Sequence, residues 1–208
     1  KVILYHHNKP KFSYVIEKAL SRYAKTLEER QKAARQRGFV KYQWEVPEDR
    51  IYEEETHRVK TEIKDHALLP FVEQNVASSP ERRFASFLES HAEHIDWWYK
   101  NGDSGKQHYS IPYTNNANEK ALFYVDFVVR MKNGQVFLFD TKTEGSDAEA
   151  PNKHNALIDY INSDENKKLG LKGGIIIQKG DNWNYSEFKI ETTTDTTSWT
   201  AFYPDQYK

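Results

Sequence analysis

Two aspartates and a lysine lie within the most apolar stretch of the chain, ALFYVDFVVRMKNGQVFLFDTK at residues 121–142. Asp126 interrupts the first apolar run of this stretch, Asp140 interrupts the second, and Lys142 follows two residues later. A carboxylate among buried apolar side chains is costly unless something compensates its charge. That cost makes this stretch the first place to look for function.

Two turn geometries fit between the apolar runs. The runs flank Lys132-Asn133-Gly134, a pattern typical of a β-hairpin. A two-residue Asn-Gly turn would place Asp126 and Asp140 on different faces of the hairpin. A three-residue loop that ends on Gly134 pairs Met131 with Gln135, and so sets Asp126 opposite Asp140 with Cβ atoms roughly 5 Å apart. We favour the three-residue loop, because a cation between the facing carboxylates would then explain both.

A third carboxylate belongs to a helix that we expect to begin at Ser78-Ser79-Pro80-Glu81, with a hydroxyl N-cap and an early proline. At 100° per residue, Glu81 falls between Phe84 and Leu88, in the centre of the apolar stripe. A carboxylate in the first turn also complements the helix dipole. The dipole does not explain why Glu81 faces inward, so we treat it as a candidate functional residue.

The remaining pattern predicts a helical lead-in followed by one α/β domain. We expect helices over residues 12–37, over 51–66 and from about Pro151 onward, with strands at Tyr109–Tyr113, Gly173–Gln178 and an edge strand within Trp183–Thr192. We divide the chain into a helical linker or lead-in segment, residues 1–75, and a domain over residues 76–208. The order helix, three strands, helix, strand indicates an α/β fold of the α+β sandwich type.

Composition limits the class of protein. The 208 residues are 38% hydrophobic and 14% aromatic, which is enough for a core despite 29% charged residues. There is no cysteine for disulfides or a thiolate zinc site, and no apolar run near the roughly 20 residues of a membrane span. We therefore expect a cytoplasmic protein without a membrane partner. The only methionine is Met131, so we expect a piece of a longer polypeptide.

Charge is distributed unevenly along the chain. Residues 1–40 hold ten Lys or Arg against three acids, a net charge of +7, although the whole chain carries −1. Such a basic helical arm favours contact with phosphates or with an acidic partner surface. A solvated helix face explains the same charges equally well.

The segment from Ser79 to about Ile161 resembles the PD-(D/E)xK nuclease superfamily. Within it, the segment is similar to the endonuclease domain that follows the helicase motor in type III restriction enzymes and related DEAD/DEAH-type helicases. The matching pieces are Glu81-x-x-Phe84-x-x-x-Leu88, Trp98-x-Lys100-Asn101, Ile111-Pro112-Tyr113, Tyr124-Val125-Asp126-Phe127 and Phe139-Asp140-Thr141-Lys142. Val125 replaces the proline of the motif, and Asp140 replaces the more frequent glutamate.

The resemblance implies a restriction-endonuclease-like core, made of a helix, a three-stranded antiparallel meander, a helix and a strand. It also implies metal-dependent hydrolysis of DNA phosphodiesters. Asp126, Asp140 and the backbone carbonyl of Thr141 would hold Mg²⁺, with Mn²⁺ as a substitute, and Glu81 would bind a second metal directly or through water. Lys142 would orient or help deprotonate the attacking water, or offset transition-state charge. Lys153, on the helix that follows, would sit near the scissile phosphate.

The same resemblance implies partners beyond DNA. These are an ATP-dependent helicase or translocase domain of the same polypeptide and a methyltransferase or specificity subunit. The chain itself has no Gly-x-x-x-x-Gly-Lys-Ser/Thr phosphate loop. Two alternatives stay open. The nuclease could act on RNA or branched DNA, or the domain could serve only in DNA binding or assembly.

Overall fold

The computed structural model describes residues 13–20, 22–23, 25–26, 44–48, 53–103 and 108–207. The chain divides into two compact units, Lys1–Glu45 and Val46–Lys208. In the first unit, residues 13–20, 22–23 and 25–26 are helical, and their side chains are exposed. The rest of the helix predicted over 12–37 lies outside the described residues. Within the described part of the chain, no helix is long and apolar enough to cross a membrane.

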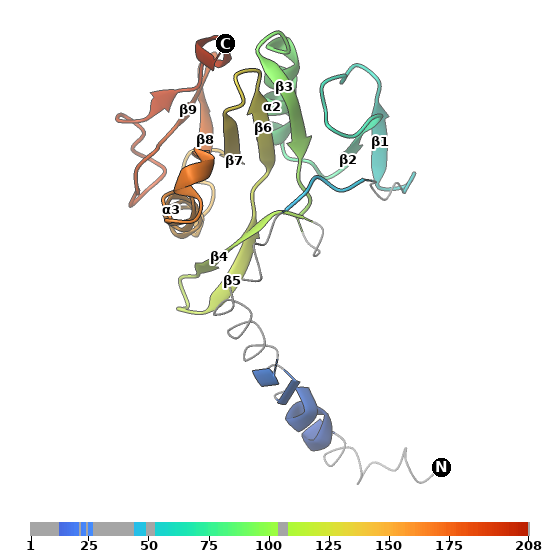
Figure 1. Ribbon diagram of the computed structural model, residues 1–208, viewed down its shortest axis with the longest axis vertical. Helices are drawn as coiled ribbons and strands as arrows, with labels where there is room; N and C mark the ends of the chain where they lie inside the picture. Colours follow the sequence, from blue (N-terminus) through green and yellow to red (C-terminus); the bar gives the residue numbers. More distant parts are fainter. Residues whose placement is uncertain are drawn as a thin grey trace. The chain divides into compact units, whose positions relative to one another are not determined.

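The second unit is a mixed α/β domain built on a mostly antiparallel sheet (Figure 1). Its six-stranded sheet has the order β10-β9-β8-β7-β6-β3, and only the β7–β8 pair is parallel. The elements are β1 (His57–Lys60), β2 (Phe71–Gln74), α2 (Ser79–Ser90), β3 (Ile95–Lys100), β4 (Ser110–Thr114), β5 (Lys120–Tyr124), β6 (Phe127–Met131), β7 (Val136–Lys142), α3 (Ala150–Ile161), η2 (Lys167–Leu169), β8 (Lys172–Lys179), β9 (Asn182–Tyr185), β10 (Thr200–Ala201) and η3 (Pro204–Tyr207).

The hairpin of β6 and β7 has the predicted three-residue loop. Phe127 pairs with Phe139, and the amide of Met131 donates to the carbonyl of Gln135 at 2.8 Å. Gly134 has φ +89°, a left-handed conformation that glycine adopts without a Cβ penalty. The predicted loop is therefore confirmed, but the paired residues end at Phe127 and Phe139 and Asp126 precedes β6, so the facing arrangement of Asp126 and Asp140 stays a prediction.

The third strand of the meander is not the one predicted. Tyr109–Tyr113 does form a strand, β4, but β4 pairs with β5 in a separate two-stranded sheet. The strand beside β6 is β3, a segment for which no strand was predicted. The cause is a break in the apolar run 121–131, because β5 ends at Tyr124 and β6 begins at Phe127. The two halves of that run therefore join different sheets.

The two helices cover opposite faces of the six-stranded sheet. Phe84 and Leu88 of α2 pack in one buried cluster with Phe127 and Phe139. Ala150 of α3 packs in a second cluster with Ile175 of β8. The next residue along β8, Ile176, belongs to the first cluster. Side chains alternate along a strand, so the two clusters lie on opposite sides of the sheet. Figure 1 shows α3 in front of the sheet and α2 behind it.

Two other predicted elements differ in the structure. The helix expected over 51–66 is wrong, because His57–Lys60 forms the strand β1 and pairs with β2. This hairpin belongs to the second unit, which begins at Val46 and not at residue 76 as the sequence suggested. Of the strand expected within Trp183–Thr192, only β9 forms, and the outer edge of the sheet is β10.

Candidate active site

The candidate site lies at the end of the sheet where β7 ends and β6 begins. Asp140 and Lys142 pair with Ile175 and Ile177 of β8, so their side chains lie on the α3 side of the sheet. Lys100 of β3 pairs with Phe127 and therefore lies on the α2 side. Asp126 precedes β6. Its carboxylate contacts Lys100 and the hydroxyl of Thr141, which pairs with Ile176 and therefore also lies on the α2 side.

Asp126 takes over the role of a backbone acceptor. Its Oδ2 accepts hydrogen bonds from the amide of Thr141 at 2.7 Å and from the Thr141 hydroxyl at 2.6 Å. The pairing of β6 with β7 stops at Phe127 and Phe139, so this carboxylate continues the connection between the strands beyond the last backbone pair. Its Oδ1 lies 3.3 Å from Lys100 Nζ.

Asn101 fixes the chain around Asp126. Its amide donates to the carbonyl of Asp126 at 2.9 Å, and its side chain donates to the carbonyls of Val125 and Tyr109 at 2.9 and 2.7 Å. Its Oδ1 accepts from the amide of Tyr109 at 3.0 Å. This buried side chain therefore satisfies the backbone groups that the break between β5 and β6 would otherwise leave unpaired.

Asp140 is buried in the sheet, with 3% of its surface exposed. Lys142 Nζ donates to its Oδ1 at 3.1 Å and lies 3.0 Å from its Oδ2. The second approach lacks hydrogen-bond geometry, so Oδ2 has no hydrogen-bond partner among the described residues. Burial raises the pKa of Asp140 to about 7, and the charge of Asp126 adds to this effect, whereas Lys142 opposes it.

The neighbouring groups stay charged near neutral pH. Burial would raise the pKa of Asp126, but Lys100, Lys142 and the hydrogen bonds from Thr141 hold this pKa below its usual value. Burial would likewise lower the pKa of Lys142, but attraction by Asp140 and Asp126 raises it well above the usual range. The site thus combines an ionised carboxylate, a protonated lysine and a carboxyl group that is half-protonated near pH 7.

Glu81 reaches the site through Lys100. The N-cap is Ser78, as predicted, and its hydroxyl donates to Glu81 Oε1 at 2.9 Å. Glu81 Oε2 lies 3.3 Å from Lys100 Nζ, and 22% of the Glu81 side chain is exposed. We expected Glu81 to lie within the apolar stripe of α2, but its side chain is only half-buried there. The role of Glu81 as a ligand of a second metal stays a prediction.

Lys100 is the residue that sequence reasoning did not single out. Its ammonium group bridges Glu81 and Asp126, with 12% of the side chain exposed. Burial would lower the pKa of Lys100, but attraction by Asp126 and Glu81 raises it above its usual value. The only signal in the sequence was its place in Trp98-x-Lys100-Asn101, because its two partners are distant in sequence.

Lys153, the last predicted site residue, belongs to α3 and lies at the border of the cluster. Its Nζ forms a 2.9 Å ion pair with Asp147, and its charge acts on Asp140.

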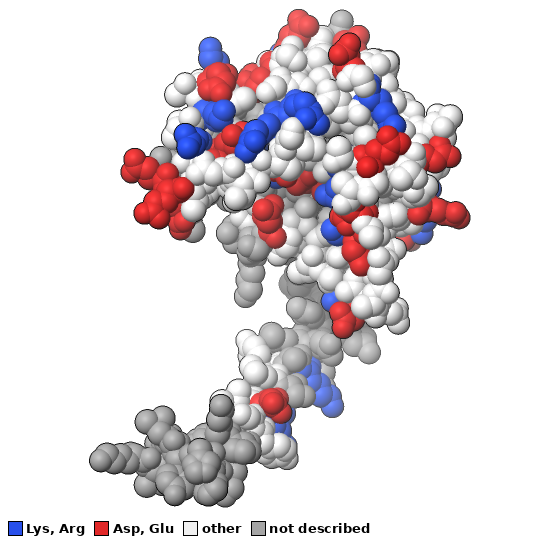
Figure 2. Space-filling model, turned by 180° about the vertical axis from the view of Figure 1, so that it is seen from behind, with Lys and Arg blue, Asp and Glu red and all other residues white. Residues whose placement is uncertain are grey.

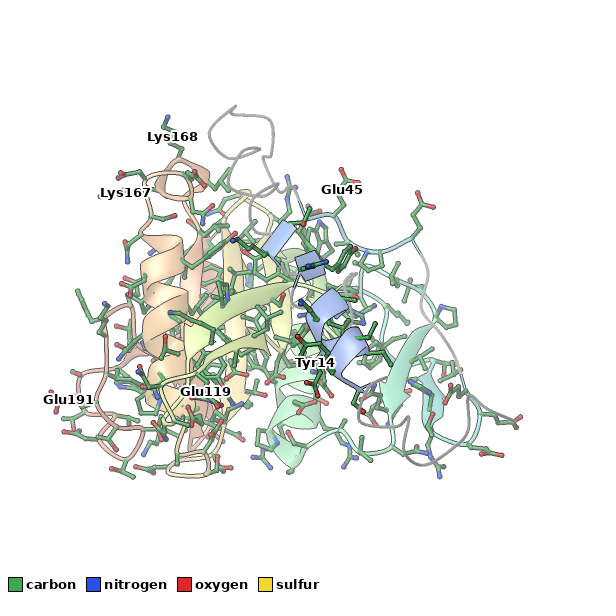
Figure 3. All side chains as sticks on the ribbon, turned by 90° about the horizontal axis from the view of Figure 1, so that it is seen from below. Tyr14, Glu45, Glu119, Lys167, Lys168 and Glu191 are labelled. Atoms are coloured by element: carbon green, nitrogen blue, oxygen red, sulfur yellow. The ribbon has the colours of Figure 1, made fainter. Side chains whose placement is uncertain are left out.

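Figure 3 shows Lys167 and Lys168 at one end of α3 and Glu119 toward the other. Glu119 follows the tip of the β4–β5 hairpin, where the amide of Asn116 donates to Glu149 at the start of α3.

A single divalent cation suits this set of donors. Among the described residues, no three His, Cys, Asp or Glu side chains are placed to hold a metal together. The charge of Asp126, which precedes β6, nevertheless acts on Asp140 of β7. Among the described residues Asp140 Oδ2 is a buried oxygen without a hydrogen-bond partner, 3.0 Å from Lys142 Nζ. Hard cations bind carboxylate and carbonyl oxygens, and such a cation would supply the missing partner of Oδ2. The residues present therefore fit the expected metal.

Comparison of the chain with family models, with curated proteins and with solved structures finds no match.

Proposed function

We propose that the second unit is a Mg²⁺-dependent endonuclease domain that hydrolyses DNA phosphodiester bonds. The observation that carries the proposal is Asp140, a buried carboxyl group beside Asp126 with one oxygen that lacks a hydrogen-bond partner. Strongly perturbed carboxyl groups gather at functional sites, because an ordinary core would exclude them. Lys142 and Lys153 place positive charge beside this group, as phosphate chemistry requires.

The order of elements supports a restriction-endonuclease-like core. Helix α2 is followed by the antiparallel strands β3, β6 and β7, then by α3 and by the parallel strand β8. That is the order of helix, meander, helix and strand that the resemblance implies. In this arrangement one end of the sheet receives side chains from α2, from the residue before β6 and from β7. These are Glu81, Asp126, Asp140 and Lys142.

Each residue has a defined part in the proposed reaction. Asp126, Asp140 and the carbonyl of Thr141 would hold the cation, which when bound supplies Lewis-acid activation of water and phosphate. Lys142 would donate to a phosphoryl oxygen and offset the charge that develops there. A lysine whose pKa lies above its usual range is a poor base, so of the roles open to Lys142 this one has the best support.

Positive charge near the site supports a nucleic acid as substrate. Arg82 and Arg83 follow Glu81 on α2 and are exposed. Figure 2 shows Lys and Arg side chains on the face that α2 covers, interspersed with Asp and Glu side chains. We propose DNA as the substrate and a helicase or translocase domain of the same polypeptide as the partner that delivers it. A methyltransferase or specificity subunit belongs to the same proposal.

Binding of Mn²⁺ tests the site itself. Isothermal titration calorimetry should show Mn²⁺ binding to the chain at millimolar concentration or below, and Asp140→Asn should weaken it at least tenfold. Asp159→Asn is the matched control, because Asp159 is exposed and pairs only with Lys189 among the described residues. Absence of Mn²⁺ binding at millimolar concentration would contradict the proposal, as would equal binding by the Asp140→Asn variant.

A second candidate is a nuclease-like domain that serves only in DNA binding or assembly. The ion pairs favour it, because Lys100 and Lys142 already compensate Asp126 and Asp140 in the absence of any cation. Buried ion pairs of this kind also occur in purely structural networks. The candidates make opposite predictions in the titration above. A binding-only domain takes up no Mn²⁺ at this cluster and still binds DNA.

A further inference from the structure

Lys100 lies where a second cation would have to sit. Its ammonium nitrogen is 3.3 Å from Glu81 Oε2 and 3.3 Å from Asp126 Oδ1, so it bridges the two carboxylates. A divalent cation shared by Glu81 and Asp126 would need the same oxygens. The two cations exclude each other at this point, because positive charges within a few ångströms repel strongly in a buried site.

Lys100 is held in this place by its surroundings. Its amide donates to His66 Nε2 at 3.0 Å, and the residue pairs with Phe127 in the sheet. Its ammonium group lies 5.3 Å from the centre of the Phe127 ring. With 12% of its side chain exposed, it lacks the rotamer freedom of a surface lysine. It is therefore a fixed charge of the site.

The oxygens of Glu81, Asp126 and Asp140 differ in the partners that they already have. Glu81 Oε1 accepts from Ser78, Glu81 Oε2 contacts Lys100, and both oxygens of Asp126 have partners. Asp140 Oδ2 is the one of these oxygens that is buried without a hydrogen bond within the described residues, although Lys142 Nζ lies 3.0 Å from it. A metal would therefore find a buried oxygen that accepts no hydrogen bond on the β7 side of the cluster, whereas on the α2 side Lys100 bridges two carboxylates.

The space beside Lys100 is also small. A cavity of about 20 Å³ is bounded there by Glu81, Lys100 and Asn101 together with residues of β2 and α2. About 10–15 Å³ on this measure holds one water, so this cavity has room for about one. Mg²⁺ requires six ligands and keeps several of its waters. A hydrated second cation does not fit while Lys100 is in place.

We propose that Lys100 replaces a second divalent cation, so that the site binds one metal through Asp126 and Asp140, and Glu81 acts as the counter-ion of Lys100. This inference rests on the proposed nuclease function and reverses the expectation that Glu81 ligates a metal. Once Asp140 has lost its proton to bind a metal, three carboxylates against two ammonium groups leave the cluster with one negative charge. One divalent cation is enough to reverse that charge, so Lys100 sets the number of metals at one.

The number of bound metals tests the inference. Mn²⁺ is titrated into the 208-residue chain while electron paramagnetic resonance measures free Mn²⁺. The wild-type chain should bind one equivalent, and Lys100→Met should bind two, because it exposes Glu81 and Asp126 to a second cation. Lys100→Met/Glu81→Gln should return to one equivalent. Lys172→Met, which changes a lysine paired with Glu187, is the matched control and should bind one.

A single substitution decides the question if Lys100→Met does not fold. Glu81→Gln keeps the shape of the side chain, and Mn²⁺ affinity should stay within about twofold of wild type, because Glu81 is not a ligand. A loss of tenfold or more would overturn the inference. Two equivalents in the wild type, or one in a folded Lys100→Met variant, would overturn it as well. No binding by the wild type would instead refute the proposed function.

Discussion

Asp126 and Asp140 come from neighbouring strands, but their pKa values shift in opposite directions. Asp126 is ionised because two lysines and the Thr141 hydrogen bonds outweigh its burial. Among the described residues the carboxyl group of Asp140 has only Lys142 as a direct partner, and burial raises its pKa to about 7. A pair of carboxyl groups whose environments separate their pKa values is typical of acid–base and metal sites. At the scale of single residues, Asp140 is therefore the most informative position.

The raised pKa of Asp140 predicts how metal binding depends on pH. Below pH 7 the group holds a proton, which a cation must displace, whereas Asp126 is already ionised there. Apparent Mn²⁺ affinity should therefore fall about tenfold for each pH unit below 7 and level off above it. Calorimetric titrations at pH 5.5, 6.5 and 7.5 measure this slope. A flat profile across that range would show that Asp140 does not couple protons to the metal.

Lys142→Ala should reduce phosphodiester cleavage by about a hundredfold or more, because the charge beside the reacting phosphate is lost. Steady-state cleavage of an oligonucleotide duplex with saturating Mg²⁺ measures the effect. Lys172→Ala removes a lysine that pairs with Glu187 on the surface, and cleavage should stay within about twofold of wild type. Equal losses in the two variants would mean that Lys142 has no specific part in the reaction.

At the scale of elements, the break between β5 and β6 positions Asp126. Asn101 satisfies that break with three side-chain hydrogen bonds and one from its amide. Buried polar groups left without partners cost about 1–3 kcal/mol each, so the side chain of Asn101 should matter for both stability and the site. The residue thus links the path of the strands to the placement of a carboxylate.

Asn101→Ala should lower the free energy of unfolding by about 3 kcal/mol, since two carbonyls and one amide lose their partner. Urea denaturation measures the change. Asn133→Ala is the matched control, because Asn133 is exposed in the hairpin loop and accepts only from the amide of Gln135 among the described residues. It should cost about 0.5 kcal/mol. Similar costs for both variants would refute the structural role given to Asn101.

Part of the fold was predictable from the sequence, because some signals involve only residues that are close along the chain. That β6 and β7 form a hairpin was predictable, because the turn signal Lys132-Asn133-Gly134 is local, but the choice between a two-residue and a three-residue loop came from the expected metal. The N-cap at Ser78 was predictable for the same reason. The partner of β6 was not, because β3 and β4 are both apolar strands and the choice between them depends on Asn101, which is distant from Asp126 in sequence.

The candidate site shows the same limit. Asp126, Asp140 and Lys142 stood out because charges are rare in apolar runs. Lys100 did not stand out, since Trp97-Trp98-Tyr99-Lys100 resembles the end of an ordinary strand with its charge in solvent. Only the fold shows that its ammonium group is enclosed by Glu81, Asp126 and the Phe127 ring.

At the scale of the whole molecule, every candidate site residue belongs to the unit Val46–Lys208. A chain truncated to residues 46–208 should therefore bind Mn²⁺ with an affinity within about twofold of the 208-residue chain. It should also unfold in one cooperative transition, as expected for a compact domain of this size. Loss of Mn²⁺ binding on truncation would place part of the site in the first unit.

The central claim is that the acidic cluster makes this chain a metal-dependent nuclease. The most direct measurement is cleavage of supercoiled plasmid DNA by the 208-residue chain in Mg²⁺, compared with the Asp140→Asn variant and with an EDTA control. We predict nicked and linear products for the wild type, none with EDTA, and at least a hundredfold less for Asp140→Asn. Intact plasmid with the wild type, or undiminished cleavage by Asp140→Asn, would contradict the claim.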